Sequence, residues 1–263
     1  MTWRPPPGGG ARRDRGRRPA RGRSFRAHYA TRVATTSEDP PPAAATYRQS
    51  GFPAIPGAVD ILLIRHGESQ AYTPGVPFPM ADGHGDPPLA PNGHEQAKLL
   101  ADRLASASID AIYVTTLRRT AQTAAPLAER LGLTPAVEPD LREVHLGEWE
   151  GGEYRQRVAE HDPLVMEAFS QQRWDVIPGA ENPAGLSARV RGAIERIARA
   201  HREQRVAVFA HGGVIGEVLA QASGSRPFAF ITSDNASISR LIVTDERWFV
   251  RTFNDTAHLQ HPE

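Results

Sequence analysis

The chain contains no cysteine, and Lys98 is its single lysine. The absence of cysteine excludes disulfide bonds, thiolate nucleophiles and cysteine-based zinc sites. Long apolar runs are missing as well. No stretch approaches the roughly 20 residues needed to cross a bilayer, and the N-terminal region lacks the apolar core of a secretory signal. We therefore expect no membrane partner and a cytoplasmic location.

Charged residues are unevenly divided along the chain. Residues 1–33 hold ten arginines and one acidic residue, a formal charge of +9, which leaves −8 on residues 34–263 within the overall +1. An acidic body with a local cationic site favours a small anionic substrate as the partner, and we do not expect nucleic acid. Association of the arginine-rich segment with RNA stays open as an alternative.

Residues 1–56 are rich in proline, glycine, arginine and alanine. Such a segment buries too little apolar surface to offset the entropy lost on ordering, so we predict a disordered extension. Whether it is a solvated tail, a targeting segment or the product of a misassigned start codon stays open. The rest is predicted as one domain over residues 57–256, followed by a tail over residues 257–263.

Three short apolar runs alternate with helix-like stretches. The runs end at Ile64, Val114 and Ala210, and each leads through polar or glycine residues into a segment with helical character. This order is the βα repeat of a doubly wound sheet. We predict an α/β fold, a three-layer αβα sandwich around a mostly parallel doubly wound sheet, with a C-terminal hairpin of Ile238–Thr244 and Trp248–Asn254.

The other predicted elements follow from the same patterns. Strands are placed at Asp60–Arg65, Ile109–Val114, Thr134–Glu138 and Val206–Ala210, and helices at Gly93–Ala105, Leu117–Leu131, Tyr154–Arg173, Ser187–Arg202 and Val214–Ala222. Ser187 is expected to cap its helix, and Gly132 to end the second one. Two irregular segments, 71–92 and 144–186, are expected to roof a crevice beyond the strand ends.

Two histidines and two arginines lie at or just after the ends of the predicted strands. Ligands of such sheets bind beyond the carboxyl ends of parallel strands, so we expect Arg65, His66, Arg119 and His211 to converge on one pocket. His66 suits a nucleophile for phosphoryl transfer if its other ring nitrogen donates to a backbone carbonyl. The guanidinium groups match phosphate oxygens, and His211 can add a donor. The pattern therefore predicts a phosphate site.

Five segments carry a family resemblance. In chain order they are LLIRHGES (62–69), TTLRRTAQTA (115–124), LREVHLGEWEG (141–151), PGAEN (178–182) and FAHGGVI (209–215). Together they resemble the motifs of the histidine phosphatase superfamily, the phosphoglycerate-mutase-like proteins. The resemblance extends from about Val59 to Asn254.

The resemblance implies a metal-independent phosphatase that hydrolyses a small phosphorylated substrate through a phosphohistidine, with no cofactor. The roles it implies are catalytic for His66 and Glu143 and phosphate-binding for Arg65, Arg119 and His211, with Ser69, Tyr72 and Gly212 as candidate substrate contacts. Glu143 would protonate the leaving oxygen and then deprotonate water. Glu148 and Glu150 compete with Glu143 for that role, and the motif alignment favours Glu143.

Alternatives to the phosphatase come from two classes. A phosphoglycerate-type mutase is the nearest, although the interval from Glu143 to His211 is short for one. A non-catalytic module that docks phosphoproteins is the other. A homodimer stays open. Arg118 is expected to be a solvated charge, and His84 an ordinary loop histidine, because the histidine spacing matches no metal-ligand pattern.

Overall fold

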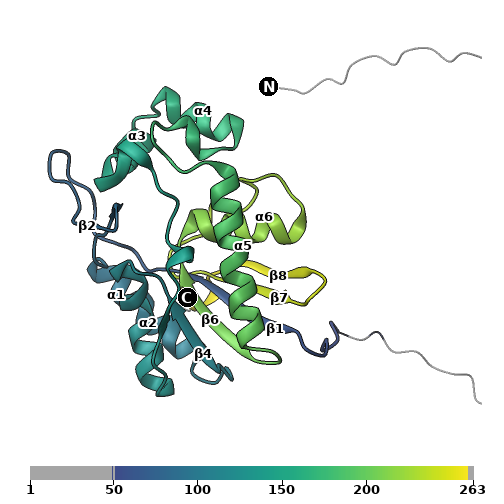
Figure 1. Cartoon of the computed structure of the whole chain (residues 1–263). Coiled ribbons are helices and arrows are strands. Elements are labelled where there is room, and N and C mark those ends of the chain that lie inside the picture. Colours follow the sequence, from purple (N-terminus) through teal and green to yellow (C-terminus); the bar gives the residue numbers. More distant parts are fainter. Residues whose placement is uncertain (1–48, 50, 260–263) are drawn as a thin grey trace, which may run out of the picture. The chain divides into compact units, whose positions relative to one another are not determined.

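The structure is a computed structural model that describes residues 49 and 51–259 (Figure 1). Most of the predicted N-terminal extension, residues 1–48 and 50, and the last part of the predicted tail, residues 260–263, lie outside the described residues. From Gly51 onward the described chain belongs to one compact unit. Within the described part, no helix is long and apolar enough to cross a membrane.

A six-stranded sheet forms the centre of the unit. Its strands lie in the order β5 (Ala136–Val137), β4 (Ala111–Val114), β6 (Arg205–Ala210), β1 (Val59–Arg65), β7 (Ile238–Val243) and β8 (Trp248–Asp255). The first four strands run parallel to one another. Strand β7 is antiparallel to both of its neighbours, β1 and β8. The predicted α/β fold with a mostly parallel sheet and a C-terminal hairpin is therefore confirmed.

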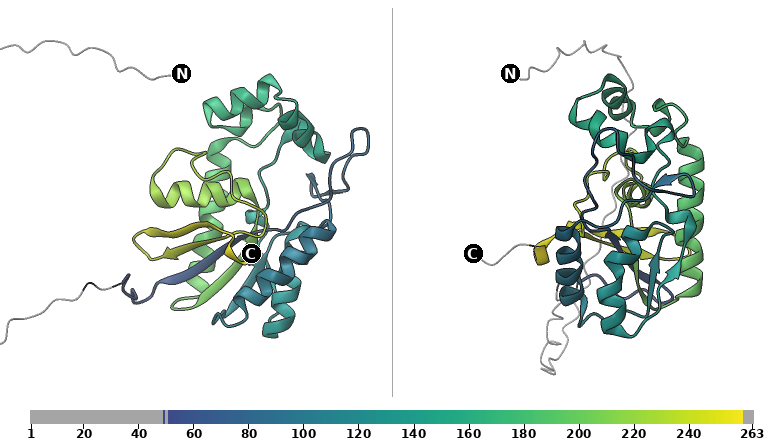
Figure 2. Two further views of the ribbon diagram at one scale, coloured as in Figure 1. Left: turned by 180° about the vertical axis from the view of Figure 1, so that it is seen from behind. Right: turned by 90° about the vertical axis from the view of Figure 1, so that its left-hand side faces the viewer.

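Helices cover both faces of this sheet (Figures 1 and 2). On one face lie α1 (Pro91–Leu104) and α2 (Arg118–Leu131), and on the other lie α5 (Pro183–Ala200) and α6 (Gly212–Ser223). Strand β1 is buried on both faces, since Leu62 and Ile64 pack in the first layer and Ile61 and Leu63 in the second. This explains why its sequence is a continuous apolar run rather than an alternating one.

The register of two neighbouring strands places the two predicted catalytic motifs side by side. Arg65 at the end of β1 pairs with Ala210 at the end of β6. The next residue on each strand is a histidine, and the backbone N–H of His66 donates to the Ala210 carbonyl at 3.0 Å. His66 and His211 therefore leave the same edge of the sheet together.

Smaller elements lie in the two predicted irregular segments. The first segment contains β2 (Met80–Ala81) and β3 (His84–Gly85); the second contains η2 (Gly147–Gly152), α3 (Glu153–Ala159), α4 (Pro163–Gln171) and η3 (Trp174–Val176). The two segments are joined by backbone contact, because Phe78 N–H donates to the Gly151 carbonyl at 2.8 Å. The remaining short helices are η1 (Pro139–Leu141) and η4 (Ala257–Leu259).

Two helix predictions were wrong in detail. The single helix expected over Tyr154–Arg173 is two helices, because His161 adopts φ of 56° and Asp162 caps α4 ahead of a proline at its first position. Ser187 does not cap α5. Asn182 caps it instead by accepting the Gly185 N–H at 2.8 Å. The ending of α2 at left-handed Gly132 is as predicted.

Candidate active site

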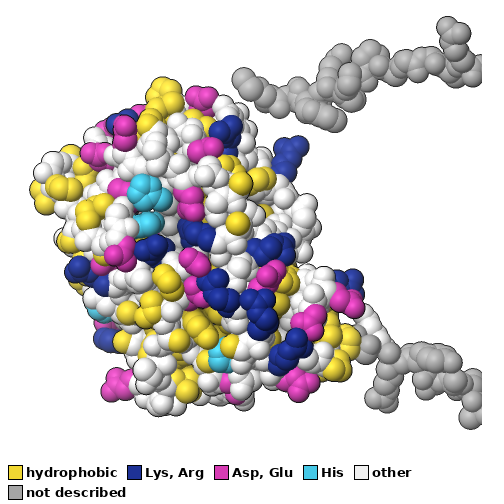
Figure 3. Space-filling view, in the orientation of Figure 1, with side chains coloured by type: hydrophobic (Ala, Val, Ile, Leu, Met, Phe, Trp, Pro, Cys, Tyr) yellow, Lys and Arg dark blue, Asp and Glu magenta, His cyan; other side chains and the backbone are white. Residues whose placement is uncertain are grey.

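A cavity of about 230 Å³ lies beyond the carboxyl ends of β1 and β4. Residues of the sheet ends and of both irregular segments line it, including four aromatic side chains, Phe78, Trp149, Tyr154 and Trp174. Four of the five residues given catalytic or phosphate-binding roles, Arg65, His66, Arg119 and Glu143, also line it. In the space-filling view, histidine and basic side chains lie side by side on the face below α3 and α4 (Figure 3).

The ring of His66 is oriented by its two nitrogen atoms. Nδ1 lies 2.7 Å from the carbonyl oxygen of Gly67, so it must carry the proton in that bond. Nε2 then holds the lone pair, and it accepts a hydrogen bond from Nε of Arg119 at 3.3 Å. Burial, followed by the charges of Arg119 and Arg65, lowers the pKa of His66 well below its usual value. The ring therefore stays neutral, with a nucleophilic nitrogen inside the cavity.

The backbone around His66 is fixed by neighbouring segments. Its carbonyl accepts from Asn235 Nδ2 at 3.0 Å and from the Ala236 N–H at 3.2 Å. The following N–H, that of Gly67, donates to Thr123 Oγ1 on α2 at 3.0 Å. His66 is consequently held by the sheet, by α2 and by the segment before β7.

Arg119 and Arg65 bring permanent positive charge to the cavity. Arg119 is buried in the first turn of α2 and donates from Nη1 to the Gly85 carbonyl at 3.0 Å. Burial lowers the pKa of Arg119 to about 10, which leaves it charged at neutral pH. Arg65 donates from Nη1 to the Ser233 carbonyl, whereas its buried Nε has no partner.

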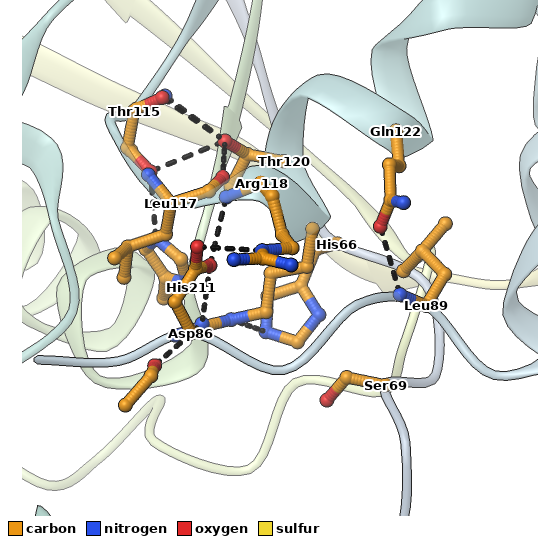
Figure 4. Close-up of polar contacts among 12 residues, drawn as sticks. His66, Ser69, Asp86, Leu89, Thr115, Leu117, Arg118, Thr120, Gln122 and His211 are labelled. Carbon is orange, nitrogen blue, oxygen red and sulfur yellow. Dashed lines mark hydrogen bonds and ion pairs between the residues drawn. The ribbon is translucent and has the colours of Figure 1, made fainter. Parts of the chain in front are cut away.

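His211 is fully buried beside His66. Its ring centre lies 5.2 Å from that of His66, and its Nε2 lies 3.0 Å from Thr115 Oγ1 (Figure 4). It does not line the cavity. Its Nδ1, like Arg65 Nε, is buried without a partner. Of these two residues, Arg65 lines the cavity.

The three candidate acids have different surroundings. Glu143 lines the cavity and accepts from the Val144 N–H at 3.0 Å and the Gly213 N–H at 3.3 Å. Glu150 also lines it, but its two oxygens hold β3 to η2 by accepting the N–H groups of Gly85 and Leu146 at 2.7 and 2.9 Å. Glu148 is exposed and lies outside the cavity. Glu143 and Glu150 thus share a place in the cavity and two backbone contacts each. Glu143 is the carboxylate whose charge acts most strongly on both Arg65 and Arg119, which keeps it the preferred candidate for the proton donor.

Arg189 on α5 fixes the backbone that carries Glu143. Its Nη1 donates to the carbonyls of Asp140 and Arg142 at 2.6 and 2.9 Å, and its Nη2 to that of Glu143 at 3.2 Å. The same guanidinium forms a two-pronged pair with Glu181 at 2.6 and 2.8 Å. Glu181 belongs to the fourth motif, PGAEN (178–182), and Arg189 lies seven residues beyond that motif.

The three candidate substrate contacts lie at the edges of the site. Ser69 and Tyr72 line a second cavity of about 500 Å³, which shares Arg65 and His66 with the first. Ser69 Oγ accepts a hydrogen bond from Arg155 at 2.8 Å. Gly212 lines neither cavity. A Cβ there would lie 3.4 Å from Arg65 Nε, so Gly212 gives the guanidinium room.

Sequence reasoning missed several residues of the site. Arg155 on α3 lines both cavities but lies in no predicted motif. One expectation was wrong. His84 is buried, lines the first cavity and lies edge-on to His145, with ring centres 5.2 Å apart. Arg118 is exposed, as expected, and it also pairs with buried Asp86, which accepts its Nε at 2.8 Å and its backbone N–H at 2.8 Å (Figure 4). Asp86 directly follows the two-residue strand β3, which no sequence pattern predicted.

Comparison with known proteins agrees with this geometry. Residues 61–256 match the histidine phosphatase superfamily (branch 1), and the chain belongs to that superfamily. It is 34% identical to phosphoglycerate mutase-like protein 4 of Arabidopsis thaliana, over 76% of this chain and 87% of that protein. It is 31% identical to the metal-independent phosphoserine phosphatase of the same plant, over 76% of this chain and 83% of that protein.

A solved structure supports both fold and family. The mycobacterial glucosyl-3-phosphoglycerate phosphatase superposes with a TM-score of 0.63 at 26% identity, over 76% of this chain and the whole of that one. The matches to the superfamily and to phosphatases in it support a phosphatase of the histidine phosphatase type.

Proposed function

We propose that the chain is a metal-independent phosphatase that hydrolyses small phosphomonoesters through a phosphohistidine on His66. The observation that carries the proposal is the state of His66: its Nδ1–H donates to the Gly67 carbonyl, and its Nε2 lone pair lies among guanidinium groups in the cavity. A neutral imidazole with a fixed tautomer is a ready nucleophile.

Two transfers account for the hydrolysis. In the first, His66 Nε2 attacks phosphorus and forms the N–P bond while the ester P–O bond breaks, and the leaving oxygen takes the proton of Glu143. In the second, the Glu143 carboxylate takes a proton from water, whose oxygen bonds to phosphorus while the N–P electrons return to Nε2. The products are the alcohol and inorganic phosphate, and Glu143 regains its proton.

The arginines would stabilise the charge of the transferring group. Arg65 and Arg119 line the same cavity as His66 Nε2. The planar guanidinium group of an arginine can donate two parallel hydrogen bonds to phosphate oxygens. Because these charges are already in place, they need not reorganise during the reaction. Removal of one comparable donor typically lowers the rate by about 10²- to 10³-fold.

The size of the cavity supports a small substrate. At about 230 Å³ it lies below the range of about 300–1,000 Å³ typical of pockets for drug-sized ligands. Two similar proteins are named a phosphoserine phosphatase and a glucosyl-3-phosphoglycerate phosphatase, and both names refer to small phosphomonoesters. We therefore favour a phosphorylated metabolite over a phosphoprotein.

A panel of phosphorylated metabolites, assayed for phosphate release with EDTA present, tests the proposal. Wild-type protein is expected to hydrolyse at least one member with EDTA, and the matched His66→Ala protein none. Activity abolished by EDTA would contradict the metal-independent mechanism. Hydrolysis retained by folded His66→Ala protein would contradict the phosphohistidine.

A mutase is the second candidate, because one relative is named phosphoglycerate mutase-like. Incubation with 3-phosphoglycerate separates the two activities. A phosphatase releases phosphate and glycerate, whereas a mutase yields the 2-phospho isomer without phosphate release.

A further inference from the structure

Arg155 lies where the two cavities of the site meet. The cavity of about 230 Å³ contains the catalytic groups, and the cavity of about 500 Å³ lies next to it. Three residues line both of them, Arg65, His66 and Arg155. Arg155 is an exposed residue on α3, and its guanidinium faces these two spaces.

Uncharged groups hold this guanidinium in place. Its Nη1 donates to the Gln70 carbonyl at 2.8 Å and its Nη2 to Ser69 Oγ at 2.8 Å, while its carbon lies 5.0 Å from the centre of the Phe78 ring. An arginine has five N–H donors, so three stay available to a ligand.

Arg155, like Arg65, has no carboxylate partner among the described residues, unlike other arginines near the site. Arg157, on the same helix, pairs with Asp162 at 2.7 Å, and Arg118 pairs with Asp86 at 2.8 Å. Among residues 51–259, by contrast, the hydrogen-bonding partners of Arg155 are Gln70 and Ser69 alone. Partial burial and the nearby charge of Arg65 lower the pKa of Arg155, and the charge of Glu68 offsets part of this effect. An incoming anion would relieve the repulsion between the two guanidinium groups.

The reacting phosphoryl group is not the natural partner of this charge. Arg119 is the residue that bonds to the nucleophile, at 3.3 Å, and Arg65 precedes it on β1. Arg155 instead bonds to the segment that follows β1, at the boundary of the second cavity. This position is suited to a second anionic group on the same substrate.

We propose that Arg155 binds a carboxylate of the substrate, and that the enzyme acts on small phosphorylated carboxylic acids. This proposal rests on the phosphatase function proposed above. A carboxylate fits the planar fork of a guanidinium in a two-pronged pair. It is also compact enough to share a small cavity with a phosphoryl group.

Two matched substrate pairs test the proposal. Phospho-L-serine and O-phosphoethanolamine differ by one carboxylate, and 3-phosphoglycerate differs from glycerol 3-phosphate by a carboxylate in place of a hydroxymethyl group. Arg155→Gln is expected to lower kcat/KM for the carboxylate member of a pair about 10- to 100-fold more than for its partner. The loss should lie mainly in KM, because the carboxylate is bound alike before and during the reaction.

Arg157→Gln is the matched control. It removes the same charge from the same helix, but Arg157 lines neither of the two cavities. Its ratio of kcat/KM between the members of a pair should equal that of the wild type. Thermal unfolding of all three proteins shows that each variant is folded.

The outcomes separate the two proposals. Wild-type protein that hydrolyses neither pair nor any other phosphomonoester overturns both the function and the carboxylate site. Wild-type protein that hydrolyses the pairs, with Arg155→Gln losing equally on both members, overturns the carboxylate site alone. A selective loss in Arg155→Gln, absent from Arg157→Gln, supports it.

Discussion

The two ring nitrogens of His66 have different surroundings, and this difference determines the chemistry of the site. Nδ1 is bound to a carbonyl at 2.7 Å, whereas Nε2 is open to the cavity apart from one guanidinium contact. A histidine with both nitrogens bound to protein acceptors would be a structural residue. The arrangement here leaves one nitrogen for a phosphorus atom.

The rate of hydrolysis at mildly acidic pH reports the protonation of this ring. Burial and two nearby arginines disfavour the charged form, so the folded pKa of His66 lies well below its usual value near 6.5. The ring of His66 stays neutral as the pH falls from 8 to 6.5. We therefore expect kcat/KM, corrected for ionisation of the substrate, to show no fall with an apparent pKa near 6.5. A half-loss of kcat/KM at that pH would contradict this protonation state.

The role proposed for Glu143 can be separated from that of His66 with a substrate whose leaving group needs no proton. p-Nitrophenolate leaves without a proton, so Glu143→Gln should still form the phosphoenzyme from p-nitrophenyl phosphate. Its hydrolysis then lacks a base and should be about 10²- to 10⁴-fold slower than in the wild type. Stopped-flow absorbance should show a burst of one equivalent of p-nitrophenolate. Glu148 is exposed, so the control protein Glu148→Gln should turn over like the wild type. Loss of the burst in the Glu143→Gln protein would contradict the assignment of Glu143.

Several site residues could be predicted from the sequence because each lies at or just after the end of an apolar run. Arg65, His66 and His211 follow from that rule and from the motifs. Arg155 could not, because its partners Ser69 and Gln70 lie more than eighty positions away and no periodicity connects them.

At the scale of elements, the start of α6 determines how closely Glu143 can approach the sheet. Gly213 lies in the first turn of α6, and a Cβ there would lie 2.7 Å from Glu143 Oε1 and 2.7 Å from Val144 Cγ2. Real Cβ atoms do not sit so close to neighbours, so a larger residue would displace the carboxylate. Gly213 is needed because it leaves room for Glu143 and Val144, and its backbone angle is one that other residues adopt.

Gly213→Ala is therefore expected to lower kcat at least about 10-fold, since misplacement of a catalytic group by 1 Å can reduce the rate about 10²-fold. Gly192→Ala on α5 is the control, because a Cβ there meets only the flexible Arg196 side chain at 3.4 Å. It should keep full activity and gain about 0.5–1 kcal/mol of stability. Steady-state kinetics measure the change in kcat, and urea unfolding measures the change in stability. A Gly213→Ala protein with the wild-type kcat would show that the close approach of Glu143 to Gly213 is unimportant.

The order of elements followed from the sequence better than their boundaries did. Buried strands and the α2 ending at Gly132 gave strong local signals. The division of residues 154–173 into α3 and α4 did not, because His161 takes a left-handed angle that its residue type does not demand. The sequence pattern indicated Ser187 as the cap because it lies just before the periodic apolar residues of α5. The helix in fact begins one turn earlier, after Asn182.

At the scale of the whole molecule, the fold keeps two buried imidazoles neutral. The pKa values of His66 and His211 both lie well below the usual value, mainly because of burial. The unfolded chain therefore binds more protons than the folded one below about pH 6.5. The free energy of unfolding must then decrease as the pH falls from 6.5 towards the folded pKa values, by at most about 1.4 kcal/mol per pH unit for each histidine.

Urea unfolding at pH 7.5, 6.0 and 5.0 measures this dependence. A His66→Gln, His211→Gln double variant should lose less stability between pH 6.0 and 5.0 than the wild type, because the two proton-binding sites are gone. Both proteins contain the same carboxylates, so the comparison isolates the histidines. Equal pH slopes in the two proteins would contradict the buried neutral state.

Covalent trapping is the most direct test of the central claim, that His66 carries the phosphoryl group during turnover. A radiolabelled phosphomonoester is mixed with the enzyme and quenched in alkali within milliseconds. The account predicts label on the peptide that contains residue 66, stable to alkali, labile to acid and absent from His66→Ala. An active enzyme that shows no such label, or that carries label on another residue, would contradict it.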